Sequence, residues 1–170
     1  ASRSWCFTFC ERGCGAVGHA WAIHTRPVGV PIDGAGRVGN DGATRAGVWG
    51  VAYRCCLPNM VVMGPADEAE LMHMVATSVA YDTGPSAVRY PRGEGVGVDL
   101  PEIGAALPVG RGRIIREGSG TAILSLGTRL ADAMVAADRV ADDLGPVTLA
   151  DARFAKPIDT DLVDQLAGTH

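Results

Sequence analysis

The sequence predicts an α/β protein in which helices flank a parallel sheet, followed by the start of a second α/β domain. Residues 59–90 alternate in the order strand, helix, strand, and residues 121–150 repeat that order. Two strands that are joined through a helix pair in parallel, with a right-handed crossover. The composition, 47% hydrophobic and 20% charged, is typical of a globular protein.

The overall charge argues against a nucleic-acid partner, because the net charge is -4 and basic residues do not cluster. No apolar run approaches the roughly 18 residues of a membrane-spanning helix, so we expect no membrane partner. Five cysteines cannot all pair within one chain, which favours a reduced, cytoplasmic protein. The first residue is Ala1, and the last residues follow an amphipathic run, so we expect a piece of a longer protein.

The N-terminal stretch 5–24 is apolar with a loose helical period. Three cysteines at every fourth position, together with two histidines, raise a metal or iron–sulfur hypothesis. The spacing C-x3-C-x3-C matches neither zinc nor ferredoxin patterns, so core packing of the cysteines is favoured. The residues concerned are Cys6, Cys10, Cys14, His19 and His24.

A short strand at 28–33 is expected to run into a glycine-rich loop over 32–47, which contains five glycines. A loop of this composition brings backbone close to a ligand, although an exposed turn without function has the same composition. Gly34-x-Gly36-x-x-Gly39 formally matches a dinucleotide fingerprint. That motif needs a helix at the glycines, and the Asn40-Asp41-Gly42 sequence prevents one, so a nicotinamide site is disfavoured.

The clearest unit begins with a strand at 59–63. Asp67 is a plausible N-cap with Glu70 at the third helical position, and the helix is predicted to run to Tyr81. A second strand follows at 86–90. We interpret His73, between two methionines of the helix, as structural. The apolar face of the helix is predicted to consist of Leu71, Met74, Val75 and Val79.

Arg89-Tyr90-Pro91-Arg92-Gly93 lies at the carboxyl end of this second strand, at the edge where open α/β sheets bind ligands. Guanidinium groups bind phosphate or carboxylate in bidentate fashion. Arg89 and Arg92 therefore predict an anion site, with a surface ion pair as the alternative.

A glycine-rich stretch at 93–118 is interpreted as a crossing between domains. A strand at 121–126, a helix at 129–144, a strand at 147–150 and a further helix from 161 to 166 are expected after it. This second unit is too short to cover both faces of its sheet. We therefore expect poor solubility or self-association.

Five longer motifs occur in order: I-D-x-A-G-x-V-G-x-D-G-x-T at 32–44, L-P-N-M-V-V-M at 57–63, G-P-S-A-V-R-Y-P-R-G at 84–93, L-S-L-G-T-R-L at 124–130 and D-A-R-F-A-K-P-I-D at 151–159. They resemble the 1-deoxy-D-xylulose-5-phosphate synthase family, thiamine-diphosphate enzymes of the transketolase group. The similarity extends from about Trp5 to His170. It implies a pyrimidine-binding domain over residues 1–105, a linker over 106–120 and a partial transketolase C-terminal domain over 121–170.

The resemblance also implies an activity. Members of the family join pyruvate, with loss of CO2, to glyceraldehyde 3-phosphate, for isoprenoid and thiamine biosynthesis. They require thiamine diphosphate and Mg2+, and they work as homodimers. The activating glutamate and the domain for the diphosphate and Mg2+ would precede Ala1, so this chain alone is expected to be inactive and to hold no metal.

Individual site residues follow from the resemblance. Phe9 matches the aromatic residue that stacks on the cofactor's aminopyrimidine, and Arg12 follows it as in the family. Asp41 matches the acidic residue of the glycine loop near the substrate. Arg92 matches the arginine that holds the substrate phosphate, in agreement with the anion site expected from the residues themselves.

Three positions depart from the family pattern. Cys6 replaces a substrate-contacting tyrosine, and Gly34 replaces a second phosphate-facing arginine. Arg45 replaces a catalytic histidine, and an arginine, which stays protonated, cannot act as a general base.

Three alternatives follow from these observations. One is another transketolase-like enzyme, such as the β subunit of a 2-oxo acid dehydrogenase. A second is a degenerate, non-catalytic domain that binds a partner or an anion. The third is a metal-binding module that uses Cys6, Cys10 and Cys14.

Overall fold

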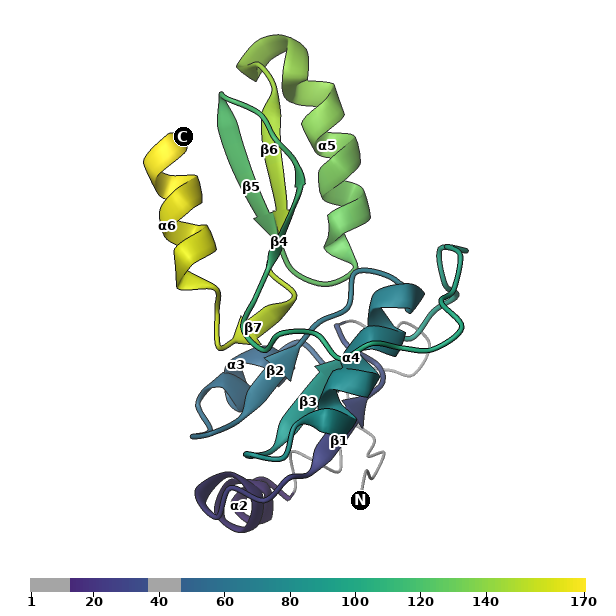
Figure 1. Cartoon of the computed structure of the whole chain (residues 1–170), viewed down its shortest axis with the longest axis vertical. Helices are drawn as coiled ribbons and strands as arrows, with labels where there is room; N and C mark the ends of the chain where they lie inside the picture. Colours follow the sequence, from purple (N-terminus) through teal and green to yellow (C-terminus); the bar gives the residue numbers. More distant parts are fainter. Residues whose placement is uncertain (1–12, 37–46) are drawn as a thin grey trace.

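The computed structural model describes residues 13–36 and 47–170, which form two sheets placed one beyond the other along the molecule (Figure 1). The first sheet has four strands in the order β1-β3-β2-β7, and the second has three in the order β4-β6-β5. Helices cover both sheets. The predicted α/β class is confirmed.

The described part of the predicted N-terminal helix is helical. The short helix α2 (Cys14–Ala16) continues into η1 (Val17–Ile23), which has the wider π-helical turn. Val17 and Ala22 are the buried residues of η1. Cys6 and Cys10 lie outside the described residues, so the cysteine stripe stays a prediction.

The first sheet has a parallel centre. Strands β1 (Gly29–Ile32), β3 (Ser86–Arg89) and β2 (Val61–Met63) pair in parallel, as the strand–helix–strand pattern predicts. β7 (Phe154–Lys156) adds to β2 in the antiparallel direction. A strand from the C-terminal part of the chain therefore completes the first sheet.

Helix α4 (Glu68–Ala80) connects β2 to β3 and has the predicted N-cap: Asp67 Oδ1 accepts a hydrogen bond from the Glu70 N–H at 2.8 Å. The predicted apolar face is only partly right. Met74 is buried and Leu71 packs beside it, but Val75 and Val79 are 44% and 70% exposed. The buried face is rotated toward Glu70 and Thr77, because these two polar side chains have specific partners across the interface.

The two faces of the first sheet pack against different helices. On one face, α4 packs on Val61, Met63, Val88 and Phe154. On the other face, η1 and α3 (Gly50–Cys55) cover the alternate side chains of the same strands. The buried residues of this second cluster are Val17, Val30, Ile32, Met60, Val62 and Ala87.

The second sheet is smaller and mixed. β6 (Val147–Asp151) lies at its centre, parallel to β5 (Thr121–Ser125) and antiparallel to β4 (Arg113–Arg116). Helix α5 (Arg129–Leu144) packs against Leu149, and α6 (Thr160–Thr169) packs against Ala150. Consecutive residues of a strand point to opposite faces, so both faces have a helix, contrary to the expectation of an uncovered face.

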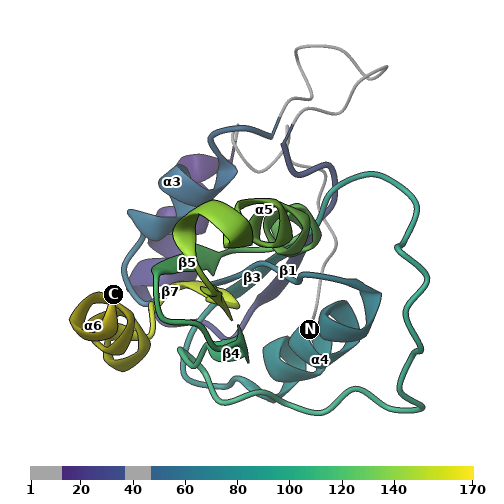
Figure 2. The same ribbon diagram turned by 90° about the horizontal axis from the view of Figure 1, so that it is seen from above.

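The segment between the sheets is long and extended, and it runs around the outer side of α4 (Figure 2). Side chains of α4 hold it: His73 Nδ1 accepts from the Ala105 N–H at 2.9 Å, and Thr77 Oγ1 accepts from the Leu107 N–H at 2.8 Å. His73 therefore has a structural contact, as predicted. The stretch 106–120, expected to be a plain linker, also contains strand β4. The domain boundaries themselves stay a prediction.

A buried ion-pair network joins the two sheets. Glu70 of α4 is 5% exposed, and both of its carboxylate oxygens accept from Arg153, at 3.0 and 2.8 Å. Arg113 of β4 bridges Glu70 at 2.9 Å and Asp151 at 3.3 Å. Burial raises the pKa of Asp151, while the Arg153 N–H and the Arg113 charge act in the opposite direction. The Glu70 carboxylate therefore binds this network, whereas its position three residues after the Asp67 N-cap predicted a capping-box arrangement.

We expect Glu70→Gln to lower the free energy of unfolding by about 3 kcal/mol, because it leaves two guanidinium groups without their shared carboxylate. Urea unfolding followed by circular dichroism measures this. The control is Glu117→Gln, an exposed residue of the same type, with an expected change below about 0.5 kcal/mol. Equal effects of the two substitutions would contradict a stabilising role for the network.

Candidate functional site

The candidate site lies where the three parallel strands of the first sheet end. β1, β2 and β3 end at Ile32, Met63 and Arg89, and the segments that follow them lie at one edge. Parallel sheets bind ligands at this carboxyl edge. Two cavities open there, one on each side of Pro65 and Pro91.

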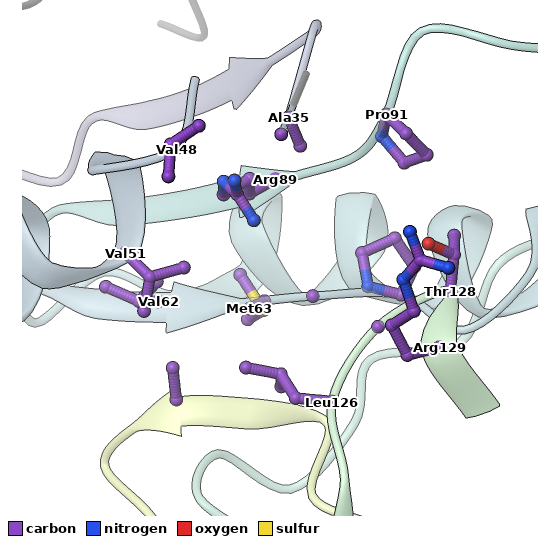
Figure 3. Close-up of a pocket in the computed structure, with 15 residues that line it drawn as sticks. Ala35, Val48, Val51, Val62, Met63, Arg89, Pro91, Leu126, Thr128 and Arg129 are labelled. Carbon is purple, nitrogen blue, oxygen red and sulfur yellow. The ribbon is translucent and has the colours of Figure 1, made fainter. Parts of the chain in front are cut away.

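The first, which we call the junction cavity, has a volume of about 490 Å³ and lies between the first sheet and the start of α5 (Figure 3). Figure 3 shows Arg89 among the apolar side chains of the first sheet, with Thr128 and Arg129 on the side of the second unit. The lining residues are Ala35, Gly36, Val48, Val51, Val62, Met63, Gly64, Pro65, Arg89, Pro91, Leu126, Gly127, Thr128, Arg129 and Ala155.

Arg89 is the main polar group of the junction cavity. It is the last residue of β3, on the strand face that also carries Ala87, and its Nη2 donates to the Gly47 carbonyl at 2.7 Å. Its Nε is buried and has no hydrogen-bond acceptor among the described residues. Burial lowers the pKa of Arg89, and repulsion from the buried Arg54 lowers it further. An anion would relieve this repulsion.

The second cavity, which we call the Arg92 cavity, has a volume of about 420 Å³ and lies beside the N-terminus of α4. Arg92 is the basic residue in its lining, accompanied by Tyr90. Burial, with a smaller contribution from the charge of Asp33, raises the pKa of Tyr90. The acidic residues in the lining are Asp33, Asp67, Glu68 and Glu94.

The structure therefore separates the two arginines that the sequence analysis placed in one anion site. Arg89 lines the junction cavity and Arg92 lines the other. Arg92 follows the strand by three residues, beyond Pro91, so the strand no longer sets the direction of its side chain. The expectation of a single two-arginine site is not supported.

The two acidic side chains at the N-terminus of α4 are already engaged. Asp67 caps the helix, and Glu68 accepts from the N–H groups of Gly97 at 2.6 Å and Val96 at 3.2 Å. The Glu68 carboxylate thus holds the loop that forms the outer wall of the Arg92 cavity. Backbone hydrogen bonds to the carboxylate lower the pKa of Glu68.

The ends of the glycine-rich loop are close together. The Gly47 N–H donates to the Gly36 carbonyl at 2.7 Å, and Arg89 binds the Gly47 carbonyl. A Cβ on Gly47 would lie 2.6 Å from the Gly34 carbonyl oxygen, so only glycine fits there. Gly34 has a positive φ of 72°, which also favours glycine. The base of the loop is therefore a fixed part of the candidate site.

Most site residues implied by the resemblance lie outside the described residues. These are Phe9 and Arg12, proposed for the cofactor, and Asp41 and Arg45, proposed for catalysis. Arg92 lines its own cavity at the expected sheet edge. Its role stays a prediction.

Metal ligands do not gather in the described part of the chain, where no group of three or more His, Cys, Asp or Glu residues could hold an ion. His19 and His24 come together at the end of η1, with ring centroids 5.1 Å apart. No described helix is long and apolar enough to cross a membrane.

Sequence reasoning missed the contribution of the second unit to the site. Thr128 and Arg129 belong to the motif L-S-L-G-T-R-L, and they reach the junction cavity because α5 begins beside the first sheet. This motif was the feature of the sequence that could have identified Thr128 and Arg129 as site residues. Its position relative to β3 depends on the ion-pair network between the sheets, which local sequence patterns do not show.

A pH titration tests the tether made by Glu68. The lowered pKa means that the tether is present above the ordinary glutamate pKa of 4.5 and is lost as the pH falls through a value below it. We expect the amide resonance of Gly97 to titrate with an apparent pKa below 4.5 in an NMR series. In Glu68→Gln this transition should be absent, and its persistence would show that another group causes it.

Gly34→Arg introduces the residue that the resemblance places at this position. We expect it to lower the free energy of unfolding by about 1 to 2 kcal/mol, because non-glycine residues are strained at a φ of 72°. Gly93→Arg is the control, since a Cβ there meets no atom within 4 Å. Equal thermal stability of both variants would disprove the strain argument.

Comparison with known proteins agrees with this architecture. Residues 4–96 match the family model "Transketolase, pyrimidine binding domain", and residues 110–170 match "Transketolase, C-terminal domain". The fold is similar to a solved structure described as "Split gene transketolase, inactive beta4 tetramer", with a TM-score of 0.87 and 27% sequence identity. The similarity covers 99% of this chain but 54% of that chain, so this chain spans about half of its length.

The first match contains β1, β2 and β3, and the second contains β4, β5, β6 and β7, so the two matches lie on either side of the segment that contacts α4 at residues 105 and 107. The pyrimidine-binding domain is a component of thiamine-diphosphate-dependent enzymes. The chain belongs to the transketolase family, with a pyrimidine-binding domain followed by transketolase C-terminal domain sequence.

Proposed function

We propose that this chain is part of a 1-deoxy-D-xylulose-5-phosphate synthase, which joins pyruvate, with loss of CO2, to glyceraldehyde 3-phosphate. The observation that supports this best is the Arg92 cavity at the carboxyl edge of the parallel sheet. Its arginine belongs to the motif R-Y-P-R-G, and a guanidinium group suits a substrate phosphate. Transketolase-family membership provides the thiamine-diphosphate chemistry.

The proposal gives this chain the pyrimidine side of the cofactor site. Phe9 would stack on the aminopyrimidine with Arg12 beside it, and Asp41 and Arg45 would face the substrate from the glycine-rich loop. The described residues offer no ligand cluster for Mg2+. In keeping with the resemblance, we assign the diphosphate and Mg2+ to a segment outside this chain, and thiamine diphosphate bound between the two would supply the chemistry of pyruvate decarboxylation.

Assembly with a second component is part of the proposal. The solved structure with 27% identity is described as an inactive β4 tetramer of a split-gene transketolase. By analogy, the present chain alone would be inactive, and activity would need a component that contributes the diphosphate-binding domain. A homodimer of the complete protein is the expected assembly.

A non-catalytic domain is the second candidate function, and one described residue favours it. Gly34 lies where the synthase family has a phosphate-facing arginine, and its positive φ shows that the backbone has adapted to glycine. Arg45, which cannot act as a general base, points in the same direction. Such a domain would retain partner or anion binding without the reaction.

A substrate panel on the protein assembled with its diphosphate-binding component tests the reaction. We expect product from pyruvate with glyceraldehyde 3-phosphate, and none from a ketose phosphate donor or from 2-oxo acids alone. Turnover of 2-oxo acids alone would favour the dehydrogenase β-subunit alternative. An assembled protein that binds thiamine diphosphate but converts no substrate would favour the non-catalytic domain.

Arg92→Gln in the same assembly tests the phosphate site. The loss of a charge-assisted hydrogen bond should raise KM for glyceraldehyde 3-phosphate about tenfold or more, and it should leave KM for pyruvate unchanged. Arg139→Gln is the matched control, since Arg139 is exposed on α5 and lines neither cavity. An equal rise for both substrates would mean that Arg92 does not hold the phosphate.

A further inference from the structure

The junction cavity has an unusual charge distribution for a space between two structural units. Its described lining contains two guanidinium groups, Arg89 and Arg129, and one hydroxyl, Thr128, but no carboxylate. The neighbouring Arg92 cavity has four acidic residues in its lining and one arginine. Of the two cavities, the junction cavity is therefore the more electropositive.

Arg89 lacks a countercharge among the described residues. Its Nη2 donates to the neutral carbonyl of Gly47, and its buried Nε has no acceptor in the described part of the chain. The second cation, Arg54, lies close enough to repel it. A buried N–H that has lost water and gained no partner is costly, so a ligand oxygen at this position would be favourable.

On the other side of the junction cavity, at the start of α5, Thr128 and Arg129 have side chains that can turn toward an anion. Thr128 stands at the N-cap of α5, but its hydroxyl makes no capping hydrogen bond. Arg129 pairs with Asp132 on the same helix, and both side chains are well exposed, at 83% and 67%. An exposed pair of this kind contributes little energy, so Arg129 can share its guanidinium with a ligand at small cost.

We propose that the junction cavity binds a small oxyanion, a phosphate or a carboxylate, between Arg89 of the first sheet and the Thr128–Arg129 start of α5. The observation behind the proposal is the buried Nε of Arg89, which has no acceptor among the described residues and faces a cavity whose described lining contains no acidic residue. The ligand bridges the two units, so its binding stabilises their relative position. This site is separate from the Arg92 cavity and does not depend on the proposed reaction.

Titration calorimetry of the 170-residue chain with inorganic phosphate, and separately with acetate, at constant ionic strength tests the site. We expect saturable binding of at least one of these anions. Phosphate binding alone would identify a phosphoryl ligand, and acetate binding alone would identify a carboxylate. The absence of saturable binding for both anions would overturn the proposal.

Four variants locate the binding. We expect Arg89→Gln to weaken the affinity about tenfold or more and Arg129→Gln to weaken it severalfold, through the loss of charge-assisted hydrogen bonds. Arg139→Gln should leave it unchanged, and Arg92→Gln shows whether the Arg92 cavity accounts for the binding instead. A loss of binding in Arg92→Gln with normal binding in Arg89→Gln would overturn the proposal and place the anion in the Arg92 cavity instead.

Arg89 also holds the base of the glycine-rich loop, so its substitution can disturb the fold. Two further measurements remain decisive in that case. The backbone amide resonances of Thr128 and Arg129 should shift on phosphate or acetate addition in the unsubstituted chain, and Arg89→Lys should retain part of the affinity. Unshifted amides at the start of α5 would show that the ligand does not reach it.

Discussion

The carboxylate of Glu70 is the contact on which the arrangement of the two sheets depends. It projects from α4 of the first unit and binds Arg153, which follows β6, and Arg113 of β4. Removing charges from water is costly unless they are paired and hydrogen-bonded, and here both carboxylate oxygens have partners. An approach of the two sheets at another angle would leave these charges buried without partners. The network therefore favours one relative position.

This position determines what the sheet edge can bind. Because α5 begins beside Pro65, Thr128 lines both cavities. The second unit therefore covers the carboxyl edge of the first sheet, which would otherwise be open to solvent. Pro91 separates Arg89 from Arg92, so two arginines of one short motif serve different cavities. The described lining of the Arg92 cavity contains four acidic residues, whereas that of the junction cavity contains apolar residues, Thr128 and Arg129 besides Arg89. The chemistry of each cavity thus follows from the junction as much as from β3.

The sequence predicted those elements whose signals are local. The helix at 129–144 agrees at both ends with α5, because its amphipathic pattern is long and Gly145 ends it with a positive φ. The Asp67 cap was found for the same reason. β4 and β7 were missed because each is short and is stabilised by a distant strand, β6 and β2 respectively. The buried role of Glu70 was missed because its partners lie far along the chain.

The motif D-A-R-F-A-K-P-I-D shows why the resemblance supports the fold while the roles of the site residues stay predictions. Asp151 and Arg153 belong to the ion-pair network, and Lys156 donates to two carbonyls at the end of α3, at 3.0 and 2.6 Å. Asp159 caps α6 and accepts from Gly112. The charged side chains of this motif thus have structural contacts, and Ala155 alone of its residues lines the junction cavity. Agreement in this motif therefore supports the family and the architecture, whereas the proposed reaction would depend on other residues, Phe9, Asp41 and Arg92, whose roles stay predictions.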